Sequence, residues 1–295
     1  MNPTHHELNE AVAAAQDERD RAFHDLRAVQ RKLLEMNEHM EQAEMCRSHF
    51  LSNIRNQVNS PISSLIGLSA ILQGTRAPDT GEVRKIARVI QCEVLDLDFD
   101  MRNMLAAAEM EAGDAVLAAR RIEVRPFLAN CIESLAHKAE EKGVPVHVSA
   151  GFPEAVVQDP EKVSLIVANL LRNAVEYSRP GGEVWLSLEK DGENLRIVVR
   201  DEGEGMPPDA VPYVFDRFFQ AAQGTARSHR GSGLGLSVVK AAVELMEGRI
   251  SLESAAGRGT TVTVVLPETA VDAEGESRFG NDLLIEEADG EERLV

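Results

Sequence analysis

Residues 201–206 have the sequence Asp201-Glu-Gly203-Glu-Gly205-Met206, and residues 231–236 have the sequence Gly231-Ser-Gly233-Leu-Gly235-Leu236. The first stretch follows a segment of alternating apolar residues, and the second opens a segment with apolar residues at helical spacing. Glycines at such strand and helix ends let the backbone approach a ligand closely, and the N-terminus of a helix attracts phosphate. The second stretch is therefore typical of a loop that approaches phosphate oxygens, whereas the first, taken alone, could be only a turn.

The surrounding sequence alternates between helical and strand patterns. Asp191-Gly192 separates two alternating segments and predicts a hairpin, and Gly248 is expected to end the last helix. Helices are predicted at 126–142, 160–177 and 236–247, and strands at 121–124, 144–149, 155–158, 183–188, 195–200, 249–253 and 260–265. Helices mixed with mostly antiparallel strands indicate an α+β fold built as a sandwich of two layers.

Three further motifs accompany the two glycine stretches. Asn169-Leu-Leu-Arg-Asn173-Ala174 lies in a predicted helix, where the four-residue spacing places both carboxamides on one face. Gly257-Arg-Gly259-Thr260 precedes the last strand, and Phe215-Asp-Arg-Phe218-Phe219 lies between the two glycine stretches. Taken singly, the asparagines could be polar residues on a solvent-exposed helix face, and the phenylalanines could simply pack in the core. The occurrence of all these motifs in one order makes chance improbable.

In this order the motifs resemble the ATP-binding boxes of the histidine-kinase and gyrase-type ATPase superfamily. The resemblance implies an α/β sandwich of the Bergerat type, with ATP and Mg²⁺ as cofactors. It implies that Asn173 is a ligand of Mg²⁺, that Asp201 accepts a hydrogen bond from the adenine amino group, and that the phenylalanines anchor a lid over ATP. The nucleotide-binding residues it assigns are Asn169, Asn173, Asp201, Gly203, Gly205, Phe215, Phe218, Arg230, Gly231, Gly233, Leu234, Gly235 and Thr260.

One position near this expected site departs from the family pattern. Family members often have a basic residue three positions after the Mg²⁺-side asparagine, whereas this chain has Glu176. An acid beside a triphosphate weakens affinity through like-charge repulsion unless the metal or a neighbouring cation compensates.

The first part of the chain has a heptad pattern. From Leu8 to Ile54, residues spaced alternately four and three apart are apolar at twelve of fourteen positions. This pattern predicts a dimeric coiled coil, although one long helix lying on its own domain would share it. A turn-rich segment at 74–81 and a second helix at 82–111 complete a helical hairpin, and two hairpins would form a four-helix bundle.

Residues 50–62 have the sequence Phe50-Leu-Ser-Asn-Ile-Arg-Asn56-Gln57-Val-Asn59-Ser60-Pro-Ile62. They resemble the phosphoacceptor helix of sensor histidine kinases, whose usual form is F-L-x-N-x-S-H-E-L-R-T-P-L. Asn56 replaces the acceptor histidine and Gln57 replaces the adjacent acid, so the nucleophile and the group thought to accept its proton are both missing. The heptad register places Asn56 on the exposed face. His49, seven residues earlier, is a weaker alternative acceptor.

Composition excludes several classes of partner. The net charge of −18 disfavours nucleic acid and anionic membranes. No apolar run is long enough for a membrane span, and three isolated cysteines indicate reduced thiols, so we expect a cytoplasmic protein. Residues 268–295 carry ten acids and two arginines and are expected to be a disordered tail.

These observations predict a coiled coil at 1–48, a phosphoacceptor-like hairpin at 49–112, an ATP-binding domain at 118–267 and the tail. The leading hypothesis is a homodimer, or a heterodimer with a related kinase, that binds Mg-ATP, lacks self-phosphorylation at position 56 and regulates a response-regulator receiver domain or a partner kinase. One alternative is hydrolysis of a receiver's aspartyl phosphate through Gln57 and Ser60. Another is phosphorylation in trans, of a partner histidine or, less favoured, of a serine on an anti-sigma antagonist.

Overall fold

The computed structural model describes residues 30, 32, 36, 37, 52, 55, 58–73, 80–149, 151–219 and 233–268. Most of the predicted coiled coil, the positions Asn56 and Gln57, His49 and the acidic tail lie outside these residues, and their predictions stay predictions. The chain divides into two compact units, Met1–Leu97 and Asp98–Val295, which are considered separately. No helix among the described residues is long and apolar enough to cross a membrane.

The described part of the first unit is helical. Residues 58–73 form one helical stretch that continues through Pro61, and the Ser63 hydroxyl donates to the carbonyl of Asn59 at 2.8 Å. Helix α2 (Thr80–Ala112) confirms the helix predicted at 82–111 and continues into the second unit. Large apolar side chains are exposed along both helical stretches: Ile62, Ile66, Ile71, Val89, Val94, Leu95, Met101 and Leu105.

The second unit is built on a five-stranded sheet with the order β2-β4-β5-β7-β6. Its strands are β2 (Val146–Val148), β4 (Val184–Asp191), β5 (Asn194–Asp201), β6 (Arg249–Ala255) and β7 (Gly259–Pro267). Only the β2–β4 pair is parallel, and the predicted hairpin is the β4–β5 pair, in which Asp191 faces Asn194. A separate antiparallel pair joins β1 (Arg120–Glu123) to β3 (Ala155–Gln158).

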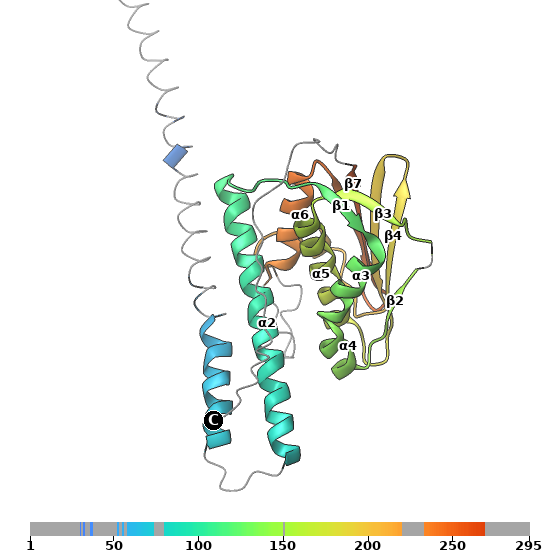
Figure 1. Cartoon of the computed structure of the whole chain (residues 1–295). Helices are drawn as coiled ribbons and strands as arrows, with labels where there is room; N and C mark the ends of the chain where they lie inside the picture. The colour runs from blue at the N-terminus through green and yellow to red at the C-terminus, as the bar shows by residue number, and fades with distance from the viewer. Residues whose placement is uncertain are drawn as a thin grey trace, which may run out of the picture. The chain divides into compact units, whose positions relative to one another are not determined.

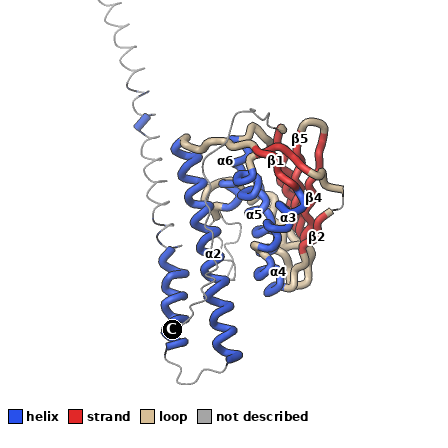
Figure 2. Tube along the Cα trace, in the orientation of Figure 1, coloured by secondary structure: helices blue, strands red, loops and turns tan. Residues whose placement is uncertain are grey.

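Helices cover one face of this sheet, which gives the expected two layers (Figures 1 and 2). They are α3 (Val124–Glu133), α4 (Ala136–Lys142), α5 (Pro160–Tyr177) and α6 (Gly235–Leu245). Apolar side chains from alternate strand positions and from the inner helix faces fill the space between the layers, because each element must bury its apolar side. The largest fully buried members include Ile166, Leu170, Leu171, Leu186, Ile197 and Leu266. The α+β sandwich predicted from the sequence is confirmed.

Helix α5 begins and ends where the sequence predicts. Asp159 is its N-cap, because its side chain accepts hydrogen bonds from the backbone N–H groups of Glu161 and Lys162 at 2.9 and 3.0 Å. Pro160 occupies the first turn, where a missing N–H costs nothing. The other oxygen of Asp159 accepts from the backbone N–H of Ala118 at 2.7 Å and so joins the helix start to the segment before β1.

Two sequence predictions about helices are wrong. The single helix expected at 126–142 is two helices, which separate at Ser134 and Leu135, where Leu135 turns into the core with 4% exposure. Gly248 is not the left-handed residue that ends α6. Glu247 takes that conformation, with φ of 54°, and Gly248 is required instead because a Cβ there would lie 2.7 Å from the Val265 carbonyl oxygen.

Candidate nucleotide site

Asp201 ends β5 with its side chain buried at 7% exposure. One carboxylate oxygen accepts hydrogen bonds from the backbone N–H groups of Gly203 and Thr260, at 2.8 and 3.1 Å. Burial raises the pKa of Asp201, and these two hydrogen bonds oppose that rise. The second carboxylate oxygen makes no hydrogen bond within the described residues, so it can accept one from a ligand amine.

The glycines beside Asp201 let three segments meet without side chains between them. A Cβ on Gly203 would lie 2.3 Å from the carbonyl oxygen of Tyr177, at the end of α5. Gly205 has a φ of 63°, and a Cβ there would lie 2.0 Å from the carbonyl oxygen of Ala255, at the end of β6. The two glycines therefore bring the loop after β5 against the ends of α5 and β6, whereas their close approach to a ligand stays a prediction.

Ser254 on β6 belongs to this arrangement, although no sequence motif pointed to it. Its hydroxyl accepts from the backbone N–H of Met206 at 2.9 Å, and it bonds with the hydroxyl of Thr260 at 2.9 Å and the carbonyl of Gly259 at 3.1 Å. This hydroxyl ties the Asp201–Met206 loop to the start of β7. A serine at an intermediate strand position looks like any other from sequence alone.

The two asparagines of α5 differ in environment. Both lie beside the N-terminus of α6, because a Cβ on Gly235 would lie 2.9 Å from Asn169 Oδ1 and 3.6 Å from Asn173 Nδ2. Asn169 is 1% exposed, and its Nδ2 donates to Asn103 Oδ1 at 2.7 Å and to the Leu165 carbonyl at 2.8 Å. Asn173 is only half-buried, and its side chain makes no hydrogen bond within the described residues. Asn173 is therefore better placed than Asn169 to contact a ligand.

The segments before and after residues 220–232 meet at their ends. The backbone N–H of Phe218 donates to the carbonyl of Gly233 at 2.8 Å, and Phe218 itself has a φ of 63°, which is uncommon for a bulky residue. Leu234 is buried, whereas Phe215 is half-buried. Of the other predicted ligand residues, Arg230 and Gly231 lie outside the described residues.

Lys142 lies beside Glu176, the acid that replaces the basic residue common in the family. The ammonium group of Lys142, the last residue of α4, donates to the backbone carbonyls of Val175 at 3.2 Å and of Glu176, at the end of α5. Cations are favoured at a helix C-terminus. Burial lowers the pKa of Lys142, while attraction to Glu176 and Glu204 raises it. The sequence did not point to Lys142, because the two helix ends are joined only in the fold.

The described residues offer Mg²⁺ few ligands of their own. No group of three or more His, Cys, Asp or Glu side chains gathers among them as a metal site. The amide oxygen of Asn173 suits Mg²⁺, which commonly takes one or two protein ligands and completes its shell with phosphate and water oxygens. The arrangement fits a metal that arrives with a nucleotide.

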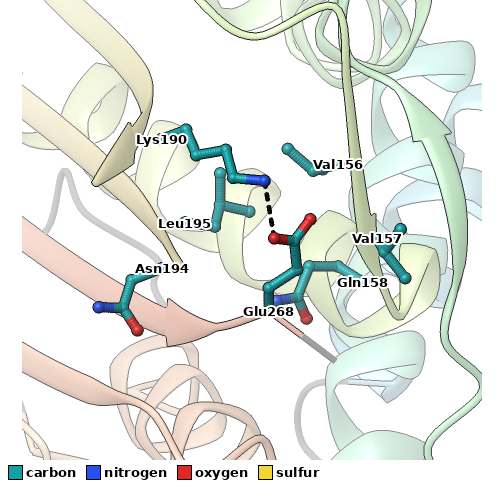
Figure 3. A pocket seen from close by; sticks show the side chains of 7 residues that line it. All are labelled: Val156, Val157, Gln158, Lys190, Asn194, Leu195 and Glu268. Carbon is teal, nitrogen blue, oxygen red and sulfur yellow. Dashed lines mark hydrogen bonds and ion pairs between the residues drawn. The ribbon is translucent and has the colours of Figure 1, made fainter. Parts of the chain in front are cut away.

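A shallow hollow lies at the opposite end of β5, lined by Val156, Val157, Gln158, Lys190, Asn194, Leu195 and Glu268 (Figure 3). Lys190 and Glu268 form an ion pair of 2.7 Å across it, and Gln158 Nε2 donates to the Pro267 carbonyl at 2.6 Å. Asn194 begins β5 and Asp201 ends it, so the hollow is separate from the candidate site. Its two charged side chains, Lys190 and Glu268, are paired with each other.

Comparisons with known proteins agree with this geometry. Residues 158–270 match the family model described as histidine kinase-, DNA gyrase B- and HSP90-like ATPase. The sensor protein DivL of Caulobacter vibrioides is 31% identical over 247 residues, which cover 83% of this chain and 31% of DivL. The sensor histidine kinase RcsC of Escherichia coli is 30% identical over 243 residues, which cover 81% of this chain and 25% of RcsC.

A solved structure has a similar fold. The histidine kinase AdeS of Acinetobacter baumannii superposes with a TM-score of 0.52 at 19% identity, over 73% of this chain and 98% of that one. This chain spans about a third of the length of the first curated relatives it matches. From the family match, the order of the boxes and the arrangement around Asp201 and Asn173, the chain contains an ATP-binding domain of the histidine-kinase family.

Proposed function

We propose that this chain is a histidine-kinase-like protein of two-component signalling that binds Mg-ATP but does not phosphorylate itself at position 56. ATP would act as a conformational ligand that shifts the ATP-binding unit between arrangements. The helical part would regulate a response-regulator receiver domain or a partner kinase. Two observations together carry the proposal. Asp201 is buried and has one carboxylate oxygen that can still accept a hydrogen bond, and Asn173 is half-buried beside the start of α6.

The polar groups support specific roles in this proposal. The second Asp201 oxygen would accept a hydrogen bond from the adenine amino group, and burial strengthens such a bond by excluding water. Asn173 would contribute its amide oxygen to Mg²⁺. The N-terminal turn of α6, which begins at Gly235, would present backbone N–H groups to the phosphates. Each role uses an atom that the described fold leaves available.

The absence of a usual acceptor supports the second half of the proposal. A carboxamide nitrogen is not a nucleophile as a neutral imidazole is, and Gln57 cannot accept a proton as a carboxylate can. Incubation of the purified chain with γ-labelled ATP tests this. We expect nucleotide binding by calorimetry without acid-labile label on the chain, and labelled wild-type protein would contradict the proposal.

Asn56→His and the double change Asn56→His with Gln57→Glu extend the same experiment. Label gained by either variant would indicate that the ATP-binding unit still reaches the helical part. A matched control is Asn59→His, which places a histidine on an exposed position three residues away. Label on Asn59→His as well would mean that the reaction does not depend on the geometry of position 56.

A second candidate function is supported by one observation on the helical stretch. Ser60 is exposed there, at one of the two positions considered for orienting water in aspartyl-phosphate hydrolysis. If this function holds, Gln57→Ala and Ser60→Ala would slow dephosphorylation of a phosphorylated receiver domain, while Ser69→Ala, also exposed on that stretch, would not. Equal rates for all three would eliminate it.

A dimer is part of the proposal, through the helical part of each chain. The large apolar side chains exposed along each helical stretch would be covered by a second copy or by a related kinase, because burying exposed apolar side chains favours association. We also propose that the protein acts in the cytoplasm, where its reduced cysteines and its ATP would be found.

A further inference from the structure

The five-stranded sheet has one face that its helices leave uncovered (Figures 1 and 2). The odd-numbered residues of β5 from 195 to 199 are buried in the core, so the alternate residues Arg196, Val198 and Arg200 point to the opposite side. We call this side of the sheet the outer face. Both arginines are exposed there, whereas Val198 is half-buried. None of the three belongs to the candidate nucleotide site.

A diagonal of apolar side chains crosses the outer face. Trp185 on β4 is opposite Arg200 in the register, and Val265 on β7 is opposite Arg196. Val198 lies between these two levels on β5, so Trp185, Val198 and Val265 are diagonal neighbours on three adjacent strands. All three are half-buried. We call them the apolar strip, and each has side-chain surface that another segment can cover.

Three exposed arginines border the apolar strip. Arg196 and Arg200 lie along β5, and Arg249, which begins β6, is opposite Val265. The guanidinium of Arg200 lies 5.2 Å from the centre of the Trp185 ring. None of the three arginines forms an ion pair with a residue that the structure describes. In a chain with a net charge of −18, three such cations on one face favour binding of acidic groups.

The carboxylates of the outer face do not neutralise these arginines. His147 Nε2 lies 3.3 Å from Glu183 Oε2. Glu189 accepts from the Ser187 hydroxyl at 2.6 Å, although the register places it opposite an arginine. Glu253 lies toward the far end of the edge strand β6. The arginines therefore remain available for acids from another segment.

The C-terminal segment of this chain has the matching chemistry. Residues 268–295 carry ten acids and two arginines, and residues 282–287 have the sequence Asp-Leu-Leu-Ile-Glu-Glu, in which acids border three apolar residues. Residues 269–295 lie outside the described residues, but their starting point is known. The backbone N–H of Glu268, directly after β7, donates to the carbonyl of Glu193 at 2.8 Å. The segment thus begins at the end of the strand that carries Val265.

The length of the chain is sufficient for residues 282–287 to reach any part of the outer face. Residues 269–281 can span up to about 45 Å when extended, whereas a sheet of five strands is about 20 Å wide. Exposed ion pairs contribute at most about 1 kcal/mol each, so a free peptide of this kind would bind weakly. A short flexible tether gives an effective concentration of about millimolar, which favours a segment of the same chain over a free partner.

We propose that residues 282–287 bind across the outer face of the sheet of the same chain. Leu283, Leu284 and Ile285 would pack on the apolar strip, and the acids on either side would pair with the three arginines. Burial of the apolar side chains would supply most of the stabilisation, and the charges would fix the position. This inference does not depend on the proposed nucleotide site.

Trp185 is the only tryptophan of the chain, so its fluorescence reports on this contact. Quenching by acrylamide, a neutral molecule, measures access to the ring in the full chain. The combined change Leu283→Ser, Leu284→Ser and Ile285→Ser should raise the quenching constant about twofold, because a segment tethered at about millimolar effective concentration covers the ring for most of the time. Val271→Ser, near the start of the same segment, is the control and should change nothing. Equal quenching in the triple variant and the wild type would overturn the inference.

An exchange of charges tests the ion pairs. Arg196→Glu with Arg249→Glu should raise the quenching constant as the triple variant does, although both arginines lie at the level of the register away from the tryptophan. Adding Glu286→Arg and Glu287→Arg should lower it again, because attraction is restored with the signs reversed. Arg120→Glu, at an exposed position of β1, is the control for charge alone. Quenching that stays high in the fourfold variant would contradict direct pairing.

Dilution distinguishes the segment of the same chain from that of a second copy. Binding within one chain predicts a wild-type quenching constant that does not change with protein concentration. A constant that rises on dilution would assign the outer face to a second copy and overturn the inference. A wild-type constant as high as that of the triple variant at every concentration would mean that the face is open to a different acidic partner, and would overturn it as well.

Discussion

The backbone N–H of Phe218 donates to the carbonyl of Gly233 at 2.8 Å and joins the two ends of the segment 220–232. Both residues are in the left-handed region, with φ of 63° and 67°. A non-glycine residue there is strained and persists only where its surroundings fix it. The pair holds the start of α6 close to the end of the preceding segment.

A side chain at position 233 should break this junction. Gly233→Ala would place a Cβ 2.7 Å from Phe218 Cα, in addition to the strain of its positive φ. We expect a loss of about 2–3 kcal/mol in the free energy of unfolding, measured by urea denaturation, and weaker nucleotide binding. Gly192→Ala is the control, because its φ is 64° but nothing lies within 4 Å of its Cβ. A loss equal to that of the control would show that the close approach is unimportant.

Replacement of Asp201 by asparagine should separate binding from stability. Asparagine keeps an oxygen that accepts from Gly203 and Thr260, but its amide nitrogen would face the adenine amino group as a second donor. We expect Mg-ATP binding to fall below detection in calorimetry, while the free energy of unfolding at pH 7 is not lowered. A variant that unfolds at pH 7 would contradict this.

The difference in free energy of unfolding between the wild type and Asp201→Asn should shift in favour of the wild type as the pH falls. The pKa of Asp201 is raised in the folded protein, so the folded state binds the proton more tightly than the unfolded state. Wild-type stability relative to Asp201→Asn should therefore increase as the pH falls from the raised folded pKa to the ordinary value for aspartate. Parallel urea titrations between pH 7 and acid conditions would measure it, and a constant difference would indicate that burial does not perturb this carboxyl.

The acid at position 176 should limit nucleotide affinity. Glu176→Gln removes a negative charge beside the site, and Lys142 would remain to attract the phosphates. We expect binding of Mg-ATP to tighten several-fold at low salt, and the gain to shrink as salt screens the charge. Glu161→Gln, in the first turn of the same helix, removes an equal charge at the opposite end and should have no such effect. Equal gains in both variants would indicate only a general charge effect.

A charge on the exposed apolar side of α2 should weaken the proposed dimer. Leu105 is 60% exposed in the single chain, and Leu105→Glu would bury a carboxylate if a second copy covers it. Sedimentation should show the monomer fraction rising at concentrations where the wild type is dimeric. Val116→Glu changes a side chain that is 79% exposed outside the helix and serves as the control. An unchanged dimer in Leu105→Glu would place the interface elsewhere.

Local sequence signals were sufficient to predict most helices and strands of the second unit. Asp159 and Pro160 mark the start of α5, and Asp191-Gly192 marks the β4–β5 hairpin, because caps and turns depend on neighbours in the chain. The break between α3 and α4 has neither glycine nor proline. It forms because Leu135 turns into the core, and the Ser134 hydroxyl donates to the Cys131 carbonyl at 2.7 Å, which no local pattern predicts.

The sequence by itself determined the α+β fold, the bounds of α5 and the order of the ATP-binding boxes, because these depend on periodicity and on residues close in the chain. Tertiary structure alone decided which side chains are available within the site. From the sequence, Asn169 and Asn173 are equivalent candidates on one helix face. In the structure, Asn169 donates a hydrogen bond to Asn103, which is 66 residues away in the chain. Lys142 likewise reaches Glu176 only because the ends of α4 and α5 meet. Such contacts depend on how helices and strands pack together in three dimensions, which a short stretch of sequence does not determine.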